Sequence, residues 1–164
     1  MKKFILLLIA LIMSQLGKAQ HSISLGWGFP ATQTLMENLL GVRTSVKGPF
    51  TFAYRYETPI NLSFGANLAY VEVLSISETV TSKFNYASLM GSADYLFIAR
   101  EKLKLYSGIS AGAAYRYNGI CADFLPALHL RFLGVRYQFS NLGVQAELGF
   151  GTNGILNAGV AYEF

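Results

Sequence analysis

The chain has 164 residues and a formal net charge of +4; 52% of its residues are hydrophobic and only 13% are charged. A disordered chain is excluded, because disordered segments are charge-rich and poor in aromatic residues, whereas 14% of this chain is aromatic. A disulfide-stapled domain is also excluded, since Cys121 is the single cysteine.

The first residues have the layout of an export signal. A positively charged start over residues 1–3 precedes ten apolar residues over Phe4–Met13, and small residues stand at Gly17 and Ala19. As a helix, those ten residues rise only about 15 Å, half of a bilayer, which argues against a membrane anchor. We therefore expect a cleavable signal peptide that ends at Ala19 and a mature chain that begins at Gln20.

Cleavage would divide the chain into a signal peptide, residues 1–19, and one domain, residues 20–164. Lys2, Lys3 and Lys18 leave with the signal, so the domain keeps ten basic and nine acidic residues and is nearly neutral. A nucleic-acid surface needs a basic patch or stripe, and none remains. We therefore expect no nucleic-acid partner.

From Ile23 onward, apolar residues alternate with small or polar ones, which is the period of a β-strand with two unlike faces. The alternation changes phase near Leu133-Gly134, where a β-bulge would switch the faces. An even number of strands would return both ends of the domain to one side. Eight such segments are expected: Ile23–Phe29, Phe50–Glu57, Leu62–Tyr70, Ala87–Phe97, Leu103–Tyr117, Leu125–Phe139, Leu142–Phe150 and Leu156–Phe164.

The less apolar face of these segments decides between a soluble and a membrane barrel. It consists mainly of Gly, Ser, Ala, Asn and Thr with few charges, which makes a poor water-facing surface. Small residues instead fit the narrow interior of an eight-stranded barrel. The pattern therefore predicts an all-β, antiparallel, up-and-down transmembrane barrel whose apolar face contacts lipid.

Aromatic residues gather at the strand ends, as in the two interfacial girdles of membrane barrels. With Gln20 on the periplasmic side, the expected outer girdle contains Trp27, Phe29, Tyr70, Tyr115, Tyr117 and Phe150. The expected inner girdle contains Tyr54, Tyr56, Tyr95, Phe97, Tyr137, Phe139, Tyr162 and Phe164.

Charged residues on the inward face are balanced in sign, which predicts a self-neutralising network inside the lumen. We name Arg136 and Glu147, on neighbouring strands, as its first pair. A proton or ion path is the alternative interpretation, but a polar core that closes the barrel is favoured. The expected members are Arg55, Lys104, Arg116 and Arg136 with Glu57, Asp94, Glu147 and Glu163.

Two outer loops are expected to be long, Pro30–Gly48 and Glu72–Lys83. In the first, Thr34 and Glu37 match a capping box, which predicts a short helix. This helix would either pack over the barrel mouth or dock a partner or lipid. Its apolar face would consist of Leu35, Met36, Leu39 and Leu40.

The chain ends in NAGVAYEF, with Tyr162 two residues before the terminal Phe164, and this ending resembles the C-terminal recognition signal of bacterial outer-membrane barrels. The segments YRYETPINLSFGANLAY and LYSGISAGAAYRY are similar to small outer-membrane β-barrels of the OmpA/OmpX transmembrane type, in the style seen in Bacteroidetes. The resemblance covers residues 20–164. It implies assembly by the barrel insertion machinery and residence in the outer membrane, in contact with lipid and lipopolysaccharide. We expect a monomer with a structural or surface-interaction role.

Catalytic chemistry finds little support in the sequence. Leu130-Arg131 follows His129 without the serine that barrel acyl hydrolases place two residues on, and His21-Ser22 stands at the mature N-terminus. No Cys/His cluster offers a metal site. We therefore expect no enzymatic activity, cofactor or metal. An outer-membrane enzyme acting on lipid and a soluble, secreted lipid-binding barrel stay open as alternatives.

Overall fold

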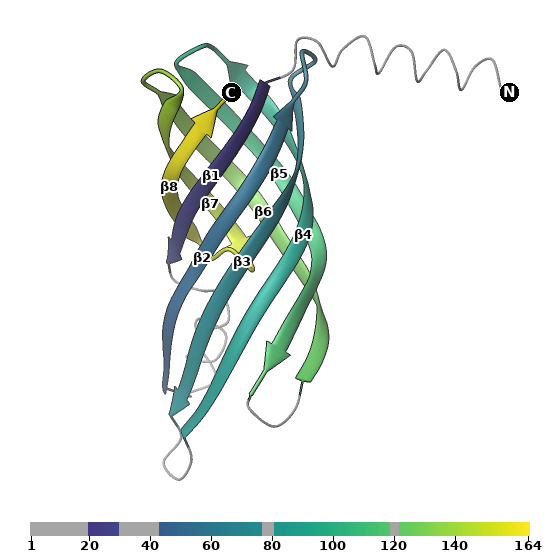
Figure 1. The fold of residues 1–164 in the computed structure, drawn as a ribbon, viewed down its shortest axis with the longest axis vertical. Helices are drawn as coiled ribbons and strands as arrows, with labels where there is room; N and C mark the ends of the chain where they lie inside the picture. The colour runs from purple at the N-terminus through teal and green to yellow at the C-terminus, as the bar shows by residue number, and fades with distance from the viewer. Residues whose placement is uncertain (1–19, 30–42, 77–80, 119–121) are drawn as a thin grey trace, which may run out of the picture.

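The computed structural model describes residues 20–29, 43–76, 81–118 and 122–164. Its strands form one closed barrel in which each pairs antiparallel with its sequence neighbours and β1 pairs with β8 (Figure 1). The predicted eight-stranded antiparallel barrel is confirmed. The strands are β1 (Gln20–Phe29), β2 (Arg43–Glu57), β3 (Leu62–Ile76), β4 (Thr81–Ala99), β5 (Leu103–Tyr117), β6 (Ala122–Gln138), β7 (Leu142–Gly151) and β8 (Leu156–Glu163).

The first strand begins and the last strand ends at the same end of the barrel. Gln20 begins β1 there, and Phe164 follows β8, where its backbone N–H donates to the His21 carbonyl at 2.9 Å. We call this the inner end and the opposite one the outer end. The signal peptide, Cys121 and the helix expected around Thr34 lie outside the described residues. In the described part of the chain, no helix is long and apolar enough to cross a membrane.

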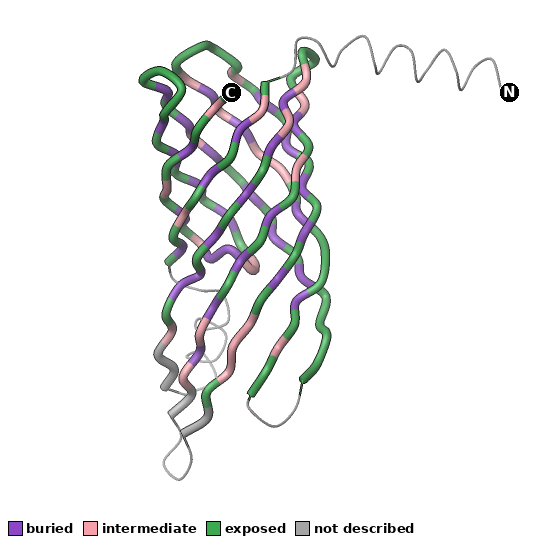
Figure 2. The backbone as a smooth tube through the Cα atoms, viewed as in Figure 1, coloured by how far each residue is buried: buried purple, intermediate pink, exposed green. Residues whose placement is uncertain are grey.

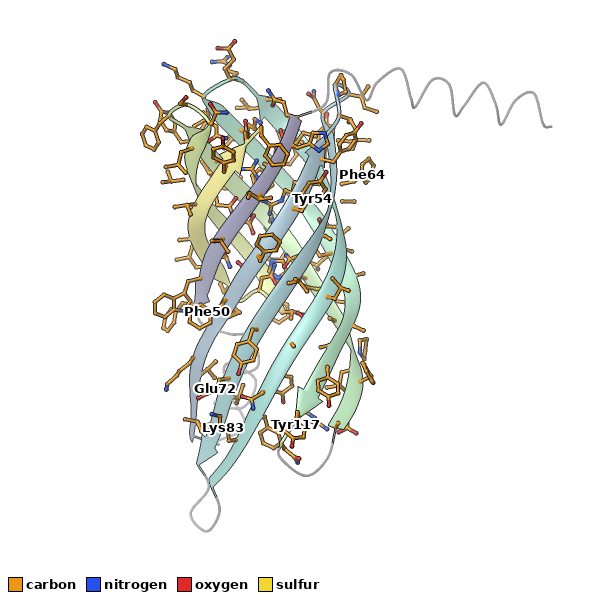
Figure 3. All side chains as sticks on the ribbon, in the orientation of Figure 1. Phe50, Tyr54, Phe64, Glu72, Lys83 and Tyr117 are labelled. Carbon is orange, nitrogen blue, oxygen red and sulfur yellow. The ribbon has the colours of Figure 1, made fainter. Side chains whose placement is uncertain are left out.

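The two faces of the wall invert the arrangement of a water-soluble domain. Buried and exposed residues alternate along the closed part of the wall, as Figure 2 shows for the backbone, whereas the outer ends of β5 and β6 are mostly exposed. Most of the large exposed side chains are apolar or aromatic, and they radiate from the wall in Figure 3. Among the described residues, twice as many polar as apolar residues are buried, and half of the buried apolar residues are alanines. The barrel is therefore polar inside and apolar outside.

The phase change in β6 is confirmed as a bulge. The pairing of β6 with β7 shifts between Arg131 and Leu133. Leu130, Phe132 and Leu133 are all exposed, whereas Gly134 is buried. The extra residue therefore moves the inward positions from odd to even numbers along β6.

The strands differ in length, which leaves an open sheet at the outer end. β1, β7 and β8 have 10, 10 and 8 residues, whereas β2 to β6 have 15 to 19. The parts of β2–β6 beyond the outer ends of the short strands form what we call the outer extension (Figure 1).

Strand therefore replaces much of the two long loops that the sequence predicts. The pairing of β2 with β3 continues beyond Gly48 through Lys47↔Glu72 to Arg43↔Ile76, with a register shift between Lys47 and Phe50. The Gly48-Pro49 dipeptide lies within this register shift. Val71 and Val73 are fully buried and pack against Val46, Phe84 and Tyr86, which gives these segments an apolar inner face.

The predicted inner girdle matches exposed aromatic rings at the inner ends of β4, β6 and β8. The ring centroids of Tyr137 and Phe139, for example, lie 5.2 Å apart. The members of the predicted outer girdle lie at different heights along the barrel axis. One row of strand partners runs Trp27↔Phe50↔Tyr70↔Ala87↔Tyr115↔Phe124. Strands about 4.8 Å apart and tilted by about 40° raise each partner roughly 3 Å along the barrel axis. Tyr115 therefore lies much closer to the outer end of the barrel than Trp27.

Candidate functional site

Four charged side chains form a closed ring halfway along the lumen, which we call the middle ring: Arg55, Asp94, Arg131 and Glu147. Arg55 Nη2 lies 2.5 Å from Glu147 Oε1, and its Nε lies 3.4 Å from Asp94 Oδ2. Arg131 Nε lies 3.1 Å from Glu147 Oε2, and its Nη1 pairs with Asp94 Oδ1. These side chains are at most 4% exposed. Each charge therefore has two partners of opposite sign, from β2, β4, β6 and β7.

A second ring of four, the inner ring, lies toward the inner end of the lumen: Glu57, Lys104, Arg136 and Glu163. Lys104 Nζ lies 2.7 Å from Glu57 Oε2 and 2.6 Å from Glu163 Oε1. Arg136 Nη1 lies 2.9 Å from Glu57 Oε1 and 3.3 Å from Glu163 Oε1. Lys104 thereby connects β5 to β2 and β8 across the lumen, so the ring spans the β1–β8 seam.

Tyr106 lies between the two rings and contacts both. Its ring centroid is 5.3 Å from the Arg55 guanidinium carbon, 5.6 Å from that of Arg131 and 5.7 Å from that of Arg136. Its hydroxyl donates to Glu147 Oε1 at 2.7 Å. Any Cβ at Gly134, the strand partner of Tyr106, would collide with the phenol ring. The glycine therefore makes room for the aromatic ring that stabilises both groups of cations.

A small void lies between the rings. The void lined by Arg55, Glu57, Asp94, Tyr106 and Arg136 among others measures about 10 Å³. That is close to the smallest volume that holds one water molecule. Side chains of both rings therefore line this void.

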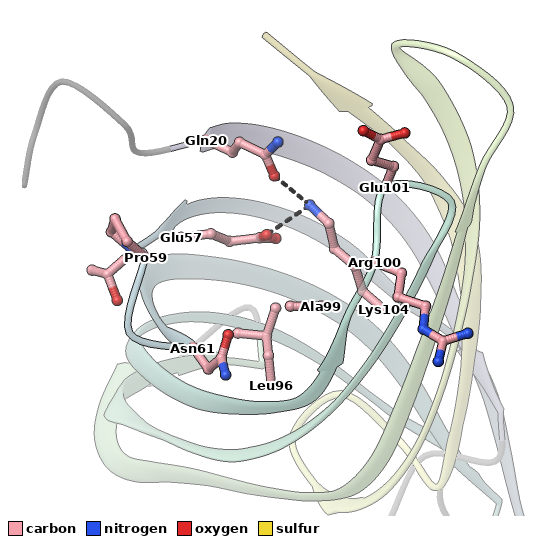
Figure 4. A pocket seen from close by; sticks show the side chains of 10 residues that line it. Gln20, Glu57, Pro59, Asn61, Leu96, Ala99, Arg100, Glu101 and Lys104 are labelled. Atoms are coloured by element: carbon pink, nitrogen blue, oxygen red, sulfur yellow. Dashed lines mark hydrogen bonds and ion pairs between the residues drawn. The ribbon is translucent and has the colours of Figure 1, made fainter.

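The inner mouth holds a larger depression of about 260 Å³ (Figure 4). The turns after β2 and β4 form its rim, with Pro59, Asn61 and Arg100. Lys104 reaches into its floor and donates to Gln20 Oε1 at 2.9 Å and to Glu57, as the dashed lines show. Two members of the inner ring, Glu57 and Lys104, thus line this depression.

At the outer end of the lumen, the close contacts involve backbone and a proline rather than charged side chains. The turn between β7 and β8 carries Asn153, which is 1% exposed, and Pro49 of β2 is also fully buried. Any Cβ at Gly28 of β1 would collide with the Asn153 carbonyl oxygen and lie 2.7 Å from the Pro49 Cγ. Glycine at this position therefore leaves room for both the turn and the proline.

The structure brings together most of the predicted lumen charges but corrects two predictions. Arg116 stays outside both rings and pairs with Asp123 at 2.7 Å, with both side chains substantially exposed. It occupies an inward position, but on the outer extension, where the barrel is no longer closed. Arg136 pairs with Glu57 and Glu163 instead of Glu147. Glu147 is the strand partner of Gly134, and its carboxylate is held by Arg55 and Arg131.

Sequence reasoning missed Arg131, whose side chain is fully buried in the middle ring. The signal was present, because Arg131 stands in the phase opposite to Leu128, Leu130 and Phe132 and so points inward. It also missed Tyr106 as the residue between the rings. Nothing in the alternation distinguishes this tyrosine from an ordinary inward aromatic residue.

The two histidines occupy different surroundings. His129 is 1% exposed, and neither ring nitrogen has a hydrogen-bond partner among the described residues. His21 lies on the outer face, where its Nδ1 is 2.7 Å from the Tyr54 hydroxyl and its ring stacks on Phe164. Ser22 points the other way, into the lumen, and accepts a hydrogen bond from Arg136. The His21-Ser22 pair therefore lies on opposite faces of β1.

The outer extension carries exposed charge pairs on its outward face. Glu72 of β3 lies 3.9 Å from Lys47 of β2 and 3.0 Å from Lys83 of β4. In the part of the chain that the structure describes, no three His, Cys, Asp or Glu side chains group as a metal site would require.

Together, the apolar outer wall, the paired charges of the lumen and the closed antiparallel sheet define a small transmembrane-type β-barrel with a polar interior. Among solved structures, the chain is similar to Ail of Yersinia pestis in a phospholipid bilayer nanodisc, at 18% identity and a TM-score of 0.51, covering 89% of this chain and 99% of that one. This likeness shows that the chain has the fold of small outer-membrane β-barrels.

Two further structures resemble it at lower TM-scores. The N-terminal β-barrel domain of Pseudomonas aeruginosa OprF is 18% identical with a TM-score of 0.49, covering 88% of this chain and 97% of that one. Neisserial surface protein A is 18% identical with a TM-score of 0.44, covering 89% and 96%. No protein-family model and no curated protein matches the sequence.

Proposed function

We propose that this chain is an outer-membrane protein whose barrel is a closed anchor and whose outer extension serves a structural or surface-interaction role. The observation that carries the proposal is the inverted wall, with apolar side chains outside and polar ones inside. Water solvates such an outer surface poorly, whereas lipid accommodates it. The likeness in fold to small outer-membrane barrels supports the same assignment.

The proposed barrel is not an open porin. A permeating ion would meet the middle ring, Tyr106 and the inner ring in succession, with a void of about 10 Å³ between the rings. Separating a buried ion pair leaves uncompensated charge in a poorly solvated space and costs several kcal/mol, about 3–5 when one partner is removed. The rings therefore act as a plug made of wall residues.

The proposed partners follow from the same surfaces. Outer-membrane lipid and lipopolysaccharide would contact the wall, and the insertion machinery would read the end of β8, where Tyr162 and Phe164 are exposed. We propose a monomer without enzymatic activity. The opposite orientations of His21 and Ser22 support this, because they keep a general base from that serine.

Membrane fractionation tests the location. The native protein is expected in the outer-membrane fraction, with a folded band that migrates differently on a gel after boiling. A soluble species with unchanged migration would overturn the membrane assignment and favour a secreted lipid-binding barrel.

Planar-bilayer recording tests the closed lumen. The native barrel should give no large, steady single-channel currents, and such currents would contradict the plug. The double variant Arg55→Ala/Glu147→Ala removes one ion pair of the middle ring and should raise the frequency of current openings. Lys47→Ala/Glu72→Ala removes one pair outside the lumen, and we expect native behaviour. Equal leak from both double variants would show that the middle ring does not close the pore.

A further inference from the structure

The outward face of the outer extension differs between its two sides. On β2–β4 it carries Lys47, Glu72 and Lys83. On β5 and β6 it carries what we call the aromatic patch: Tyr115, Tyr117 and Phe124, which are 40%, 42% and 79% exposed. Figure 3 places Tyr117 at the same end of the barrel as Glu72 and Lys83, well beyond Phe50.

The patch lies at this height because the strands are tilted relative to the barrel axis. Phe124 is five strand steps from Trp27 along one row of partners. At roughly 3 Å a step, Phe124 lies about 15 Å farther out than Trp27. Tyr115 and Phe124 also pack together, with ring centroids 5.3 Å apart.

The apolar wall is consequently uneven in height. On β7 the exposed residues from Leu142 to Phe150 span about 20 Å along the axis, at about 3.3 Å per residue and a tilt of about 40°. On β6 the stretch from Tyr137 to Phe124 spans about 30 Å by the same arithmetic when the extra residue of the bulge is not counted. Outer-membrane barrels carry an apolar band of about 25 Å, which lies between these two values.

We infer that the aromatic patch is embedded in outer-leaflet lipid. The barrel axis is then inclined to the membrane normal, and the β5–β6 wall enters the bilayer farther than the opposite wall. This inference rests on the proposed outer-membrane location. The inclination turns the charged side of the extension, with Lys47 and Lys83, toward water.

The neighbouring wall indicates that lipid contacts the aromatic patch. Leu128, Leu130 and Phe132 continue the patch toward the inner end as exposed apolar residues of the same strand. Among the described outward positions of β5 and β6 between Ala111 and Leu128, none is charged. Tyrosine and phenylalanine at the upper edge of such a wall match the boundary between acyl chains and headgroups, where amphipathic rings gather.

Tryptophan fluorescence tests the inference. Trp27 is the only tryptophan of the chain, so Trp27→Phe provides a background into which Phe124→Trp is placed. The folded variant is reconstituted in vesicles with and without brominated acyl chains. We expect brominated lipid to remove most of the Phe124→Trp emission, as in a Leu130→Trp reference, while aqueous acrylamide quenches it weakly.

Lys47→Trp, on the charged side of the extension, is the matched control and should show the reverse. Strong acrylamide quenching of Phe124→Trp without bromine quenching would overturn the inference and assign the patch to water or to a protein partner. Tyr115→Trp provides a second report if Phe124→Trp does not fold. A heat-shifted band is recorded first, because its absence in the Trp27→Phe background would count against the proposed function rather than against the inclination.

Discussion

The lumen and the outer extension both join charged side chains across strands, but they do so in different ways. In the two rings, every charge contacts two groups of opposite sign, and the side chains are 0% to 14% exposed. On the extension, Lys47 and Lys83 each make one contact with Glu72, and the two lysine side chains are 72% and 53% exposed.

The difference follows from solvation. Inside the closed barrel, protein groups replace most of the water around a charge, and only closed rings give each charge enough opposite charge nearby. On the extension, water solvates the lysines, and one contact adds little. Substitutions in the two regions should therefore differ in effect even where they remove the same kind of ion pair.

The largest effect is expected from Arg131→Met in the middle ring. The change leaves Asp94 and Glu147 to share Arg55, so the ring acquires a net negative charge in a buried space. We expect the free energy of unfolding to fall by about 3–5 kcal/mol. Denaturant unfolding of the reconstituted barrel, followed by Trp27 fluorescence, measures the change.

A second variant separates lost charge balance from lost packing. Arg131→Met/Asp94→Asn removes one charge of each sign, so the double variant should be more stable than the sum of the two single losses allows. If Arg131→Met alone lowers the free energy of unfolding by less than about 1 kcal/mol, this ring stabilises the barrel no more than exposed ion pairs do.

A smaller effect is expected from Lys104→Met in the inner ring. Arg136 still contacts both carboxylates of the ring, and Glu163 is 14% exposed. The lost hydrogen bonds to charged groups should lower the free energy of unfolding by about 1.5–3 kcal/mol. Lys102→Met in the exposed turn after β4 is the matched control. A Lys104→Met loss no larger than that of the control would show that the seam does not depend on the inner ring.

The alternation of the sequence predicts the barrel and the inward positions well, because a period of two is a local property of a strand. The alternation does not predict which charged side chains form ion pairs with one another. In a lumen this narrow, Arg136 of β6 reaches Glu57 of β2 across the barrel, so the pairing depends on side-chain length and register around the whole circumference.

The errors have the same origin. Arg116 has the inward phase, but three strands end before its level, so the alternation cannot tell that the lumen has already opened there. The alternation also cannot tell that strand tilt makes the row from Trp27 to Phe124 rise along the barrel axis, so that the aromatic residues of the outer girdle lie at different heights. Both properties belong to the closed barrel and to no single strand.

The smallest effect is expected from Glu72→Gln on the outer extension. Lys47 and Lys83 lose a carboxylate but keep their water, so the free energy of unfolding should fall by about 0–1 kcal/mol. The loss should shrink further in high salt, because exposed charges are screened within about 10 Å at 0.1 M salt. Unfolding at low and high salt measures both quantities. A salt-independent loss as large as that of Arg131→Met would mean that the extension is shielded from water, and solvation would then no longer explain why one region builds rings and the other single pairs.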